Sequence, residues 1–256
     1  TLDCWTIVDA NGDSTGPTNN TWQRTTINHE GSHSMYFYGY QSDEKKRPHD
    51  DWLISPAFAF DATKVYEVRY HYRTTTTTSY DYEFEVLLSD SGIDTDKFTT
   101  QVVPRRKYAP STVWEEQIAY VSGVGTGAHL AWRVRAETTG TYLYIDNIFV
   151  REVSCPQPID LDAKDLKQTE VTLTWDDKFG SDWEYYVVKA GGPAPVANRT
   201  PTKNKEEKIT QDSNGNVLTH TTEYEYYVRT ICDSATGEYS AWSGPFLFRT
   251  ACGVFD

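Results

Sequence analysis

Several features that mark enzymes, membrane proteins and nucleic-acid-binding proteins are missing from this sequence. No apolar run approaches the roughly 18 residues that a transmembrane helix requires. No G-x-x-x-x-G-K phosphate loop is present, and the glycine-rich stretch from Gly123 to Gly127 has the wrong spacing for one. Positive charge is scarce, with 24 Lys and Arg against 37 Asp and Glu and a formal net charge of −13. This balance argues against nucleic acid and anionic membranes as partners.

Cysteine and methionine are also rare. The four cysteines are Cys4, Cys155, Cys232 and Cys252. They form no C-x-x-C pair, so a thiolate metal site is not indicated. Sparse cysteines in a Thr- and Tyr-rich chain fit an oxidising compartment, although four buried or free thiols would give the same pattern. The only Met is Met35 and the chain starts at Thr1. We therefore interpret it as a piece of a longer secreted or cell-surface protein, with any targeting segment removed.

One apparent metal motif does not fit the chemistry that it would need. His29-Glu30-Gly31-Ser32-His33 matches the H-E-x-x-H signature of zinc proteases. That signature requires a helix, which places both histidines on one face, but Gly31 and Ser32 disfavour a helix here. In an extended chain the two histidines would lie about 13 Å apart. One Zn²⁺ cannot bridge that distance, so we expect a loop that enters a strand.

The sequence instead shows β-strand alternation and many aromatic residues. Hydrophobic content is only 38%, but 18 Tyr and 8 Trp supply large apolar areas for a core. Apolar and polar residues alternate along 66–73, 82–88 and 130–135, and turn residues such as Asn11-Gly12 separate such runs. This pattern predicts an all-β protein of antiparallel sheets with one face in the core.

The chain length and one proline-rich stretch predict two domains. Val153-Ser154-Cys155-Pro156-Gln157-Pro158 follows a predicted strand and reads as a stiff linker. We therefore place the boundary between residues 1–152 and residues 153–256. Each part has the size of one β-sandwich.

The second domain resembles the fibronectin type III family over its whole length. The residues that carry the resemblance are Val171 to Trp175, Leu218, Tyr224, Glu225 to Arg229, Tyr239 to Pro245 and Phe246 to Thr250. The resemblance implies an immunoglobulin-like sandwich with Trp175 in the core and Tyr224 as the tyrosine corner. His220 stands where the family often has Pro.

The same resemblance implies two further contacts. The first strand begins at the pole where the sixth strand ends, so we expect Cys155 and Cys232 to form a disulfide. Cys252 then resembles the opening cysteine of a following module. We also expect the Arg229 guanidinium to stack on Trp242, as in the arginine–tryptophan ladders of cytokine-receptor modules. The alternative is that Trp242 binds a sugar.

The first domain resembles the cleaved-adhesin (choice-of-anchor J) family, whose modules occur in bacterial surface proteins and are distantly similar in shape to MAM domains. The segments that carry the resemblance are Trp5 to Asp13, Trp22, Asp51 to Pro56 and Ile145 to Ile148. It implies a jelly-roll sandwich with a structural Ca²⁺. Calcium prefers six to eight oxygen ligands. The candidate ligands are Asp9, Asn11 and Asp13, with Asp146 from a last strand expected beside the first, and Asp51.

Other interpretations of these residues stay open at the level of sequence. Asp9 to Asp13 can equally form an Asn-Gly turn with solvated acids. Trp22, Tyr108 and Trp114 lie near loop-like segments, but core packing explains them as well as ligand binding does. Exposed tryptophans lining a groove would favour a glycan, whereas a flat apolar patch would favour a protein.

We expect a non-catalytic, extracellular adhesin-like fragment that binds host protein or glycan and neighbours other modules of a longer protein. The alternative is an accessory region that presents substrate to the catalytic domain of a secreted hydrolase. An independent hydrolase would rest only on scattered acids, because the separation of a glycosidase's carboxylates is not visible in a sequence.

Overall fold

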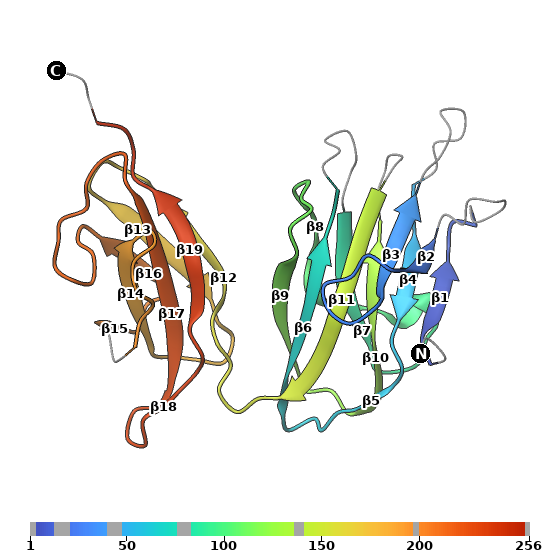
Figure 1. The fold of residues 1–256 in the computed structure, drawn as a ribbon. Helices are drawn as coiled ribbons and strands as arrows, with labels where there is room; N and C mark the ends of the chain where they lie inside the picture. Colours follow the sequence, from blue (N-terminus) through green and yellow to red (C-terminus); the bar gives the residue numbers. More distant parts are fainter. Residues whose placement is uncertain are drawn as a thin grey trace. The chain divides into compact units, whose positions relative to one another are not determined.

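The computed structural model describes residues 4–12, 21–39, 48–75, 83–135, 141–196 and 200–253. The chain forms two compact units, Thr1–Val153 and Ser154–Asp256, so the division falls within the expected linker of residues 153–158 (Figure 1). The described residues are almost wholly antiparallel strands with one short 3-10 helix, η1 (Thr95–Lys97). The all-β prediction is therefore confirmed. No helix in the described part of the chain is long and apolar enough to span a membrane.

The first unit is a sandwich of two sheets. Sheet I has the strand order β1 (Thr6–Asp9), β4 (Asp51–Ile54), β10 (Thr126–Val134), β7 (Glu83–Ser89), β8 (Thr100–Lys107), and β5 (Phe58–Ala59) also pairs with β10. Sheet II has the order β2 (Trp22–Thr25), β3 (Ser34–Gly39), β11 (Thr141–Glu152), β6 (Val65–Arg73), β9 (Glu115–Ser122). Some neighbours, such as β4 and β10 in sheet I or β3 and β11 in sheet II, come from distant parts of the sequence.

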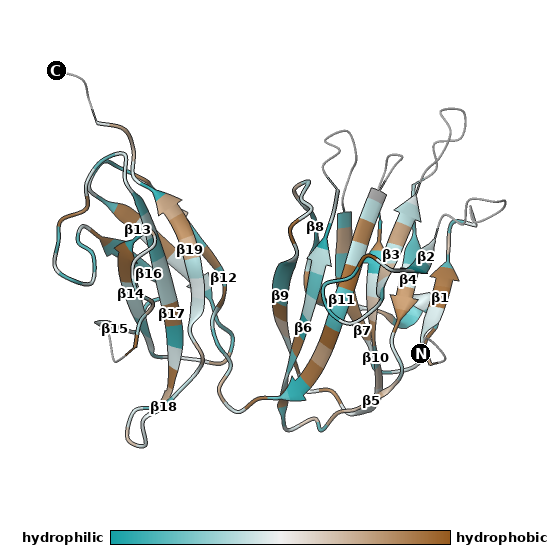
Figure 2. Ribbon diagram, in the orientation of Figure 1, coloured by the Kyte–Doolittle hydropathy of each residue, from teal (hydrophilic) through white to brown (hydrophobic). Residues whose placement is uncertain are grey.

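Aromatic residues fill the space between sheets I and II. Tyr70 of β6 and Trp132 of β10 are fully buried, and their rings meet edge to face with centroids 5.6 Å apart. Trp22 is 1% exposed and its indole donates a hydrogen bond to the Asp51 carbonyl. Large aromatic rings thus supply the burial that aliphatic residues supply in other proteins. Figure 2 shows hydrophobic and hydrophilic residues alternating along strands such as β11.

The second unit also contains two sheets. Sheet III has the order β12 (Ile159–Lys164), β13 (Val171–Asp176), β16 (Glu206–Ile209). Sheet IV has the order β15 (Thr200–Thr202), β14 (Trp183–Lys189), β17 (Glu223–Asp233), β18 (Glu238–Tyr239), and β19 (Ser243–Arg249) also pairs with β17. Trp175 is buried in the core, and the Tyr224 hydroxyl accepts a hydrogen bond from the Thr219 backbone N–H at 3.0 Å. That hydrogen bond is the one that a tyrosine corner makes.

The structure also contains both further contacts expected in the second unit. Cys155 and Cys232 form a disulfide with their Cα atoms 5.9 Å apart. Cys4 and Cys252 are exposed free thiols. The Arg229 guanidinium carbon lies 4.5 Å from the centroid of Trp242, and the same group pairs with Glu184. These contacts account for Trp242 as a structural residue.

Candidate binding face on sheet II

The residues expected to hold calcium are only partly brought together. Asp9 and Asp51 lie directly opposite each other in the β1–β4 register. Asn11 follows β1, and its amide nitrogen donates to the Pro48 carbonyl at 3.0 Å, while its side-chain oxygen is buried without a hydrogen-bond partner. Like charges directly opposite in a sheet are destabilising. The Asp9 carboxylate also accepts a hydrogen bond from the Gly12 backbone N–H at 2.7 Å, a contact typical of a turn.

This candidate set remains small. Asp13 lies outside the described residues. Within the described ranges, no group of three or more His, Cys, Asp or Glu side chains is placed to hold a metal ion.

The expectation that Asp146 lies beside the first strand is wrong. β11 pairs with β3 and β6 in sheet II, whereas β1 pairs with β4 in sheet I. The Asp146 carboxylate instead accepts the backbone N–H groups of His29, Glu30 and Asn147. Asn147 has a φ of 49° at the bulge of β11, a left-handed conformation that Asn tolerates well. Asp146 thus anchors a loop to the outer surface of sheet II.

The outer surface of sheet II carries a continuous row of side chains across the strands. Gln23 is opposite Tyr36, Tyr36 is opposite Tyr144, and Tyr144 is opposite Arg73 in the strand registers. Trp114, immediately before β9, completes the row against Arg73. The row crosses five strand positions, or about 19 Å at the usual strand spacing.

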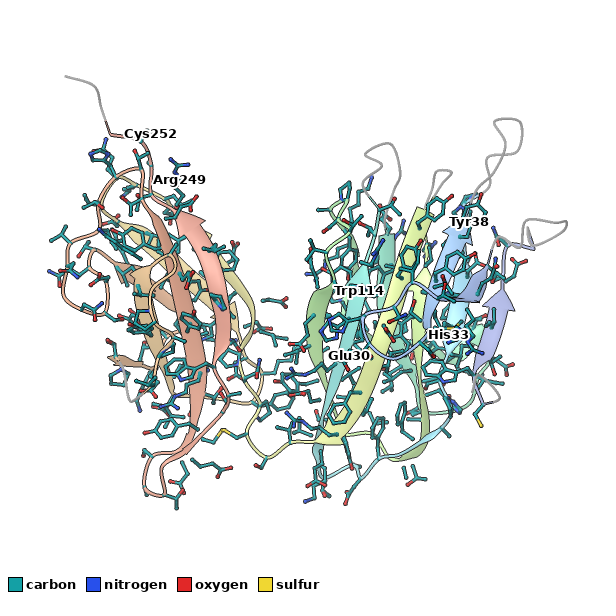
Figure 3. The ribbon with its side chains drawn as sticks, in the orientation of Figure 1. Glu30, His33, Tyr38, Trp114, Arg249 and Cys252 are labelled. Atoms are coloured by element: carbon teal, nitrogen blue, oxygen red, sulfur yellow. A yellow bond between two sulfur atoms is a disulfide. The ribbon has the colours of Figure 1, made fainter. Side chains whose placement is uncertain are left out.

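A second row lies two residues along the strands. Tyr38 is opposite Tyr142, and their ring centroids are 4.8 Å apart. In the first row, the rings of Tyr36 and Tyr144 stack at 5.7 Å. We call these seven residues the aromatic face: Gln23, Tyr36, Tyr38, Arg73, Trp114, Tyr142 and Tyr144. Tyr36, Tyr38, Trp114 and Tyr142 are half-buried, and Figure 3 labels Tyr38 and Trp114.

The loop of residues 26–33 bounds the aromatic face on one side. In Figure 1 it appears as the dark blue segment in front of β11 and β6. The His29 ring stacks on His71 with centroids 3.9 Å apart and lies 5.8 Å from the Trp114 centroid. Burial and the neighbouring His29 together lower the pKa of His71. The lowered pKa of His71 favours its neutral ring, which stacks on His29 without adding a charge of its own.

The H-E-x-x-H segment forms this loop, not a helix. His29 faces His71, whereas the His33 Nδ1 contacts Arg24 and Ser32 at 2.9 and 2.8 Å. The two histidines therefore do not share one face, as they would on the helix of a zinc protease, and the segment is a loop as expected.

A pocket of about 420 Å³ lies beside the same loop. Its apolar lining includes Trp5, Leu53 and Ile148, and its polar lining includes Arg24 and Glu30. Figure 3 labels Glu30 and His33, two of the lining residues. Because apolar and charged side chains both line the pocket, its lining does not indicate one class of ligand.

Sequence reasoning did not identify the aromatic face. Trp22 and Tyr108 are core residues, at 1% and 7% exposure, and of the three aromatics considered only Trp114 belongs to the face. The repeated Tyr-x-Tyr patterns at 36–38 and 142–144 were the available signal, because alternate residues of a strand share a face.

Comparisons with known proteins show the family of the first unit. Solved structures that resemble the chain include the K1 cleaved adhesin domain of Lys-gingipain from Porphyromonas gingivalis W83, with 16% identity, a TM-score of 0.49, and coverage of 59% of this chain and 92% of that one. The xylan-binding CBM22-1 domain of Paenibacillus barcinonensis Xyn10C has 13% identity, a TM-score of 0.40, and coverage of 61% and 90%. No curated protein matches the chain. Residues 2–150 match the model of the Cleaved Adhesin Domain, and the chain therefore belongs to that family.

Proposed function

We propose that the chain is a non-catalytic adhesin region of a secreted or cell-surface protein, and that the aromatic face of its first unit binds a glycan. The observation that carries this proposal is the row of aromatic and polar side chains across the outer surface of sheet II. Aromatic faces stack on the C–H groups of sugar rings, while their polar edges accept and donate hydrogen bonds.

The composition of the aromatic face favours a glycan over a protein. Both rows consist of aromatic, amide and guanidinium groups and include no aliphatic side chain. A protein-docking patch would expose a larger apolar area. The Tyr36 hydroxyl contacts Gln23 at 3.4 Å, so polar groups that can bond sugar hydroxyls lie beside the stacked rings. Packing of the rings against each other fixes their positions before a ligand arrives.

The test is a calorimetric titration of the full chain with neutral oligosaccharides, including xylotetraose, cellotetraose and lactose. We expect at least one to bind, and Trp114→Ala and Tyr36→Ala each to weaken its binding tenfold or more. Phe179→Ala is the matched control, since it removes a partly exposed aromatic ring from the second unit. Binding that persists unchanged in both face variants would contradict the proposal.

We propose further that the first unit binds a structural calcium ion through Asp9, Asn11 and Asp51. The opposed carboxylates and the buried Asn11 oxygen support this set. The ion would hold the ends of β1 and β4 together and take no part in ligand chemistry.

We also propose that the second unit is a fibronectin type III domain. Its three- and five-stranded sheets, its core Trp175 and the hydrogen bond of Tyr224 support this assignment. Such a domain would space the binding unit from neighbouring modules.

A further inference from the structure

Arg73 is the cation of the aromatic face, and rings hold it in place. Its guanidinium carbon lies 4.9 Å from the centroid of Tyr144 and 5.7 Å from that of Trp114. Its Nε is buried and has no hydrogen-bond partner. Among the residues that the structure describes, no Asp or Glu pairs with Arg73.

The carboxylates on the strands next to Arg73 accept hydrogen bonds from other groups. Glu115 accepts a hydrogen bond from the Tyr72 hydroxyl at 2.6 Å. Glu116 accepts one from the Arg69 guanidinium at 2.9 Å. Asp146 accepts the backbone N–H groups of the loop. Within the described ranges, the carboxylates around Arg73 thus bond to other groups and leave its guanidinium without an acidic partner.

Three other ring-stacked arginines of the described residues have carboxylate partners, whereas Arg106, which stacks on Tyr108, donates to the Gln117 amide oxygen at 2.6 Å. Arg133 lies 4.4 Å from the Trp52 centroid and pairs with Asp50 and Glu85. Arg151 and Arg229 likewise combine a ring contact with a salt bridge. A half-buried guanidinium that lacks such a partner on a binding face is ready to receive one, because charge-assisted bonds from arginine to carboxylate are among the strongest hydrogen bonds in proteins.

We propose that the aromatic face selects glycans that carry a carboxylate, as in a uronic or a sialic acid residue, and that Arg73 pairs with this group while the flanking rings stack on the sugars. This inference rests on the proposed function. The net charge of −13 repels polyanions at long range, so the ligand fits a chain with isolated acidic sugars better than a heparin-like polymer.

The experiment compares matched neutral and acidic oligosaccharides on the full chain by calorimetry. The pairs are xylotetraose against xylotetraose bearing one glucuronic acid, and lactose against 3′-sialyllactose, so that the two sources of a sugar carboxylate are distinguished. In at least one pair we expect the acidic member to bind about tenfold tighter, the gain of one charged hydrogen bond. Reducing the uronic carboxyl to an alcohol should abolish a preference in the first pair.

Variants of Arg73 test whether this residue causes the preference for the acidic oligosaccharide. Arg73→Gln should remove it while leaving the affinity for the neutral member measurable, which also shows that the variant is folded. Arg73→Lys should keep part of the preference, because it retains the charge without the planar fork. Lys97→Gln removes one positive charge beside sheet I and should change nothing.

The outcomes separate the two proposals. Equal affinities within both pairs would overturn the role of Arg73 and leave glycan binding intact. An acidic preference that survives in Arg73→Gln would also overturn it. Failure of every oligosaccharide to bind would overturn the proposed function itself, and with it this inference.

Discussion

At the scale of single residues, His71 links the stability of the first unit to pH. Its pKa is lowered from the ordinary value of 6.5 by burial and by His29, while Glu116 and Glu30 raise it and Arg69 lowers it further. The folded state therefore favours the neutral ring, and the unfolded chain binds the proton more readily near pH 6.5. The stability that this group contributes is complete above that pH and is lost as the pH falls through the folded-state pKa.

We therefore expect the thermal unfolding midpoint of the first unit to decrease when the pH is lowered from 7.5 to 5.5. The decrease should be smaller in His71→Gln. Thermal unfolding followed by hydrogen exchange would separate this unit from the second. His220→Gln, which removes an exposed histidine of the second unit, is the control and should retain the full dependence of the first. An identical pH dependence in His71→Gln and the wild type would refute this assignment.

At the scale of elements, sequence alternation predicted strands but not their neighbours. The pattern of Tyr66, Val68, Tyr70 and Tyr72 placed one face of β6 in the core, and Val68 and Tyr70 are indeed fully buried. Alternation is a local property, so one sequence suffices to find it. The aromatic face was missed because it depends on the β3–β11 pairing, which joins Tyr36 to Tyr144 across more than half of the first unit.

The error over Asp146 has the same origin. The last strand of the first unit was expected beside the first strand, but β11 lies between β3 and β6. Strand order in a sandwich of this kind is set by long-range pairing, which residue types alone do not encode. The Cys155–Cys232 pairing could be predicted because the resemblance to the fibronectin type III family implies which strand ends lie close together.

The disulfide should stabilise the second unit by linking the segment before β12 to the end of β17, across a sequence separation of 77. Closing a loop of this length restricts the unfolded chain, an effect of about 2–4 kcal/mol. The double variant Cys155→Ala/Cys232→Ala should therefore unfold at lower urea concentration in the second unit only. Cys4→Ser/Cys252→Ser provides the matched control, since both thiols are exposed and free. Equal stabilities of the two double variants would contradict the expected contribution.

At the scale of the whole molecule, the two units have separate cores and should respond separately to calcium. A ligand bound only by the folded state at a hundred times its Kd adds about 2.7 kcal/mol of stability. We expect a chelator to lower the unfolding midpoint of the first unit and to leave the second unchanged. Asp51→Asn should reduce this calcium-dependent shift, whereas Asp96→Asn, an exposed change on η1, should not. A first unit that is indifferent to both calcium and chelator would remove the case for the ion.

The proposed glycan would lie on the aromatic face of sheet II. The most direct measurement is hydroxyl-radical footprinting of the full chain, with and without the oligosaccharide that binds most tightly in the titrations. Tyr36, Tyr38 and Trp114 should lose reactivity when the sugar is bound, while Trp242 and Phe179 in the second unit should not. Protection of the second unit, with the aromatic face as reactive as in the free protein, would contradict the claim.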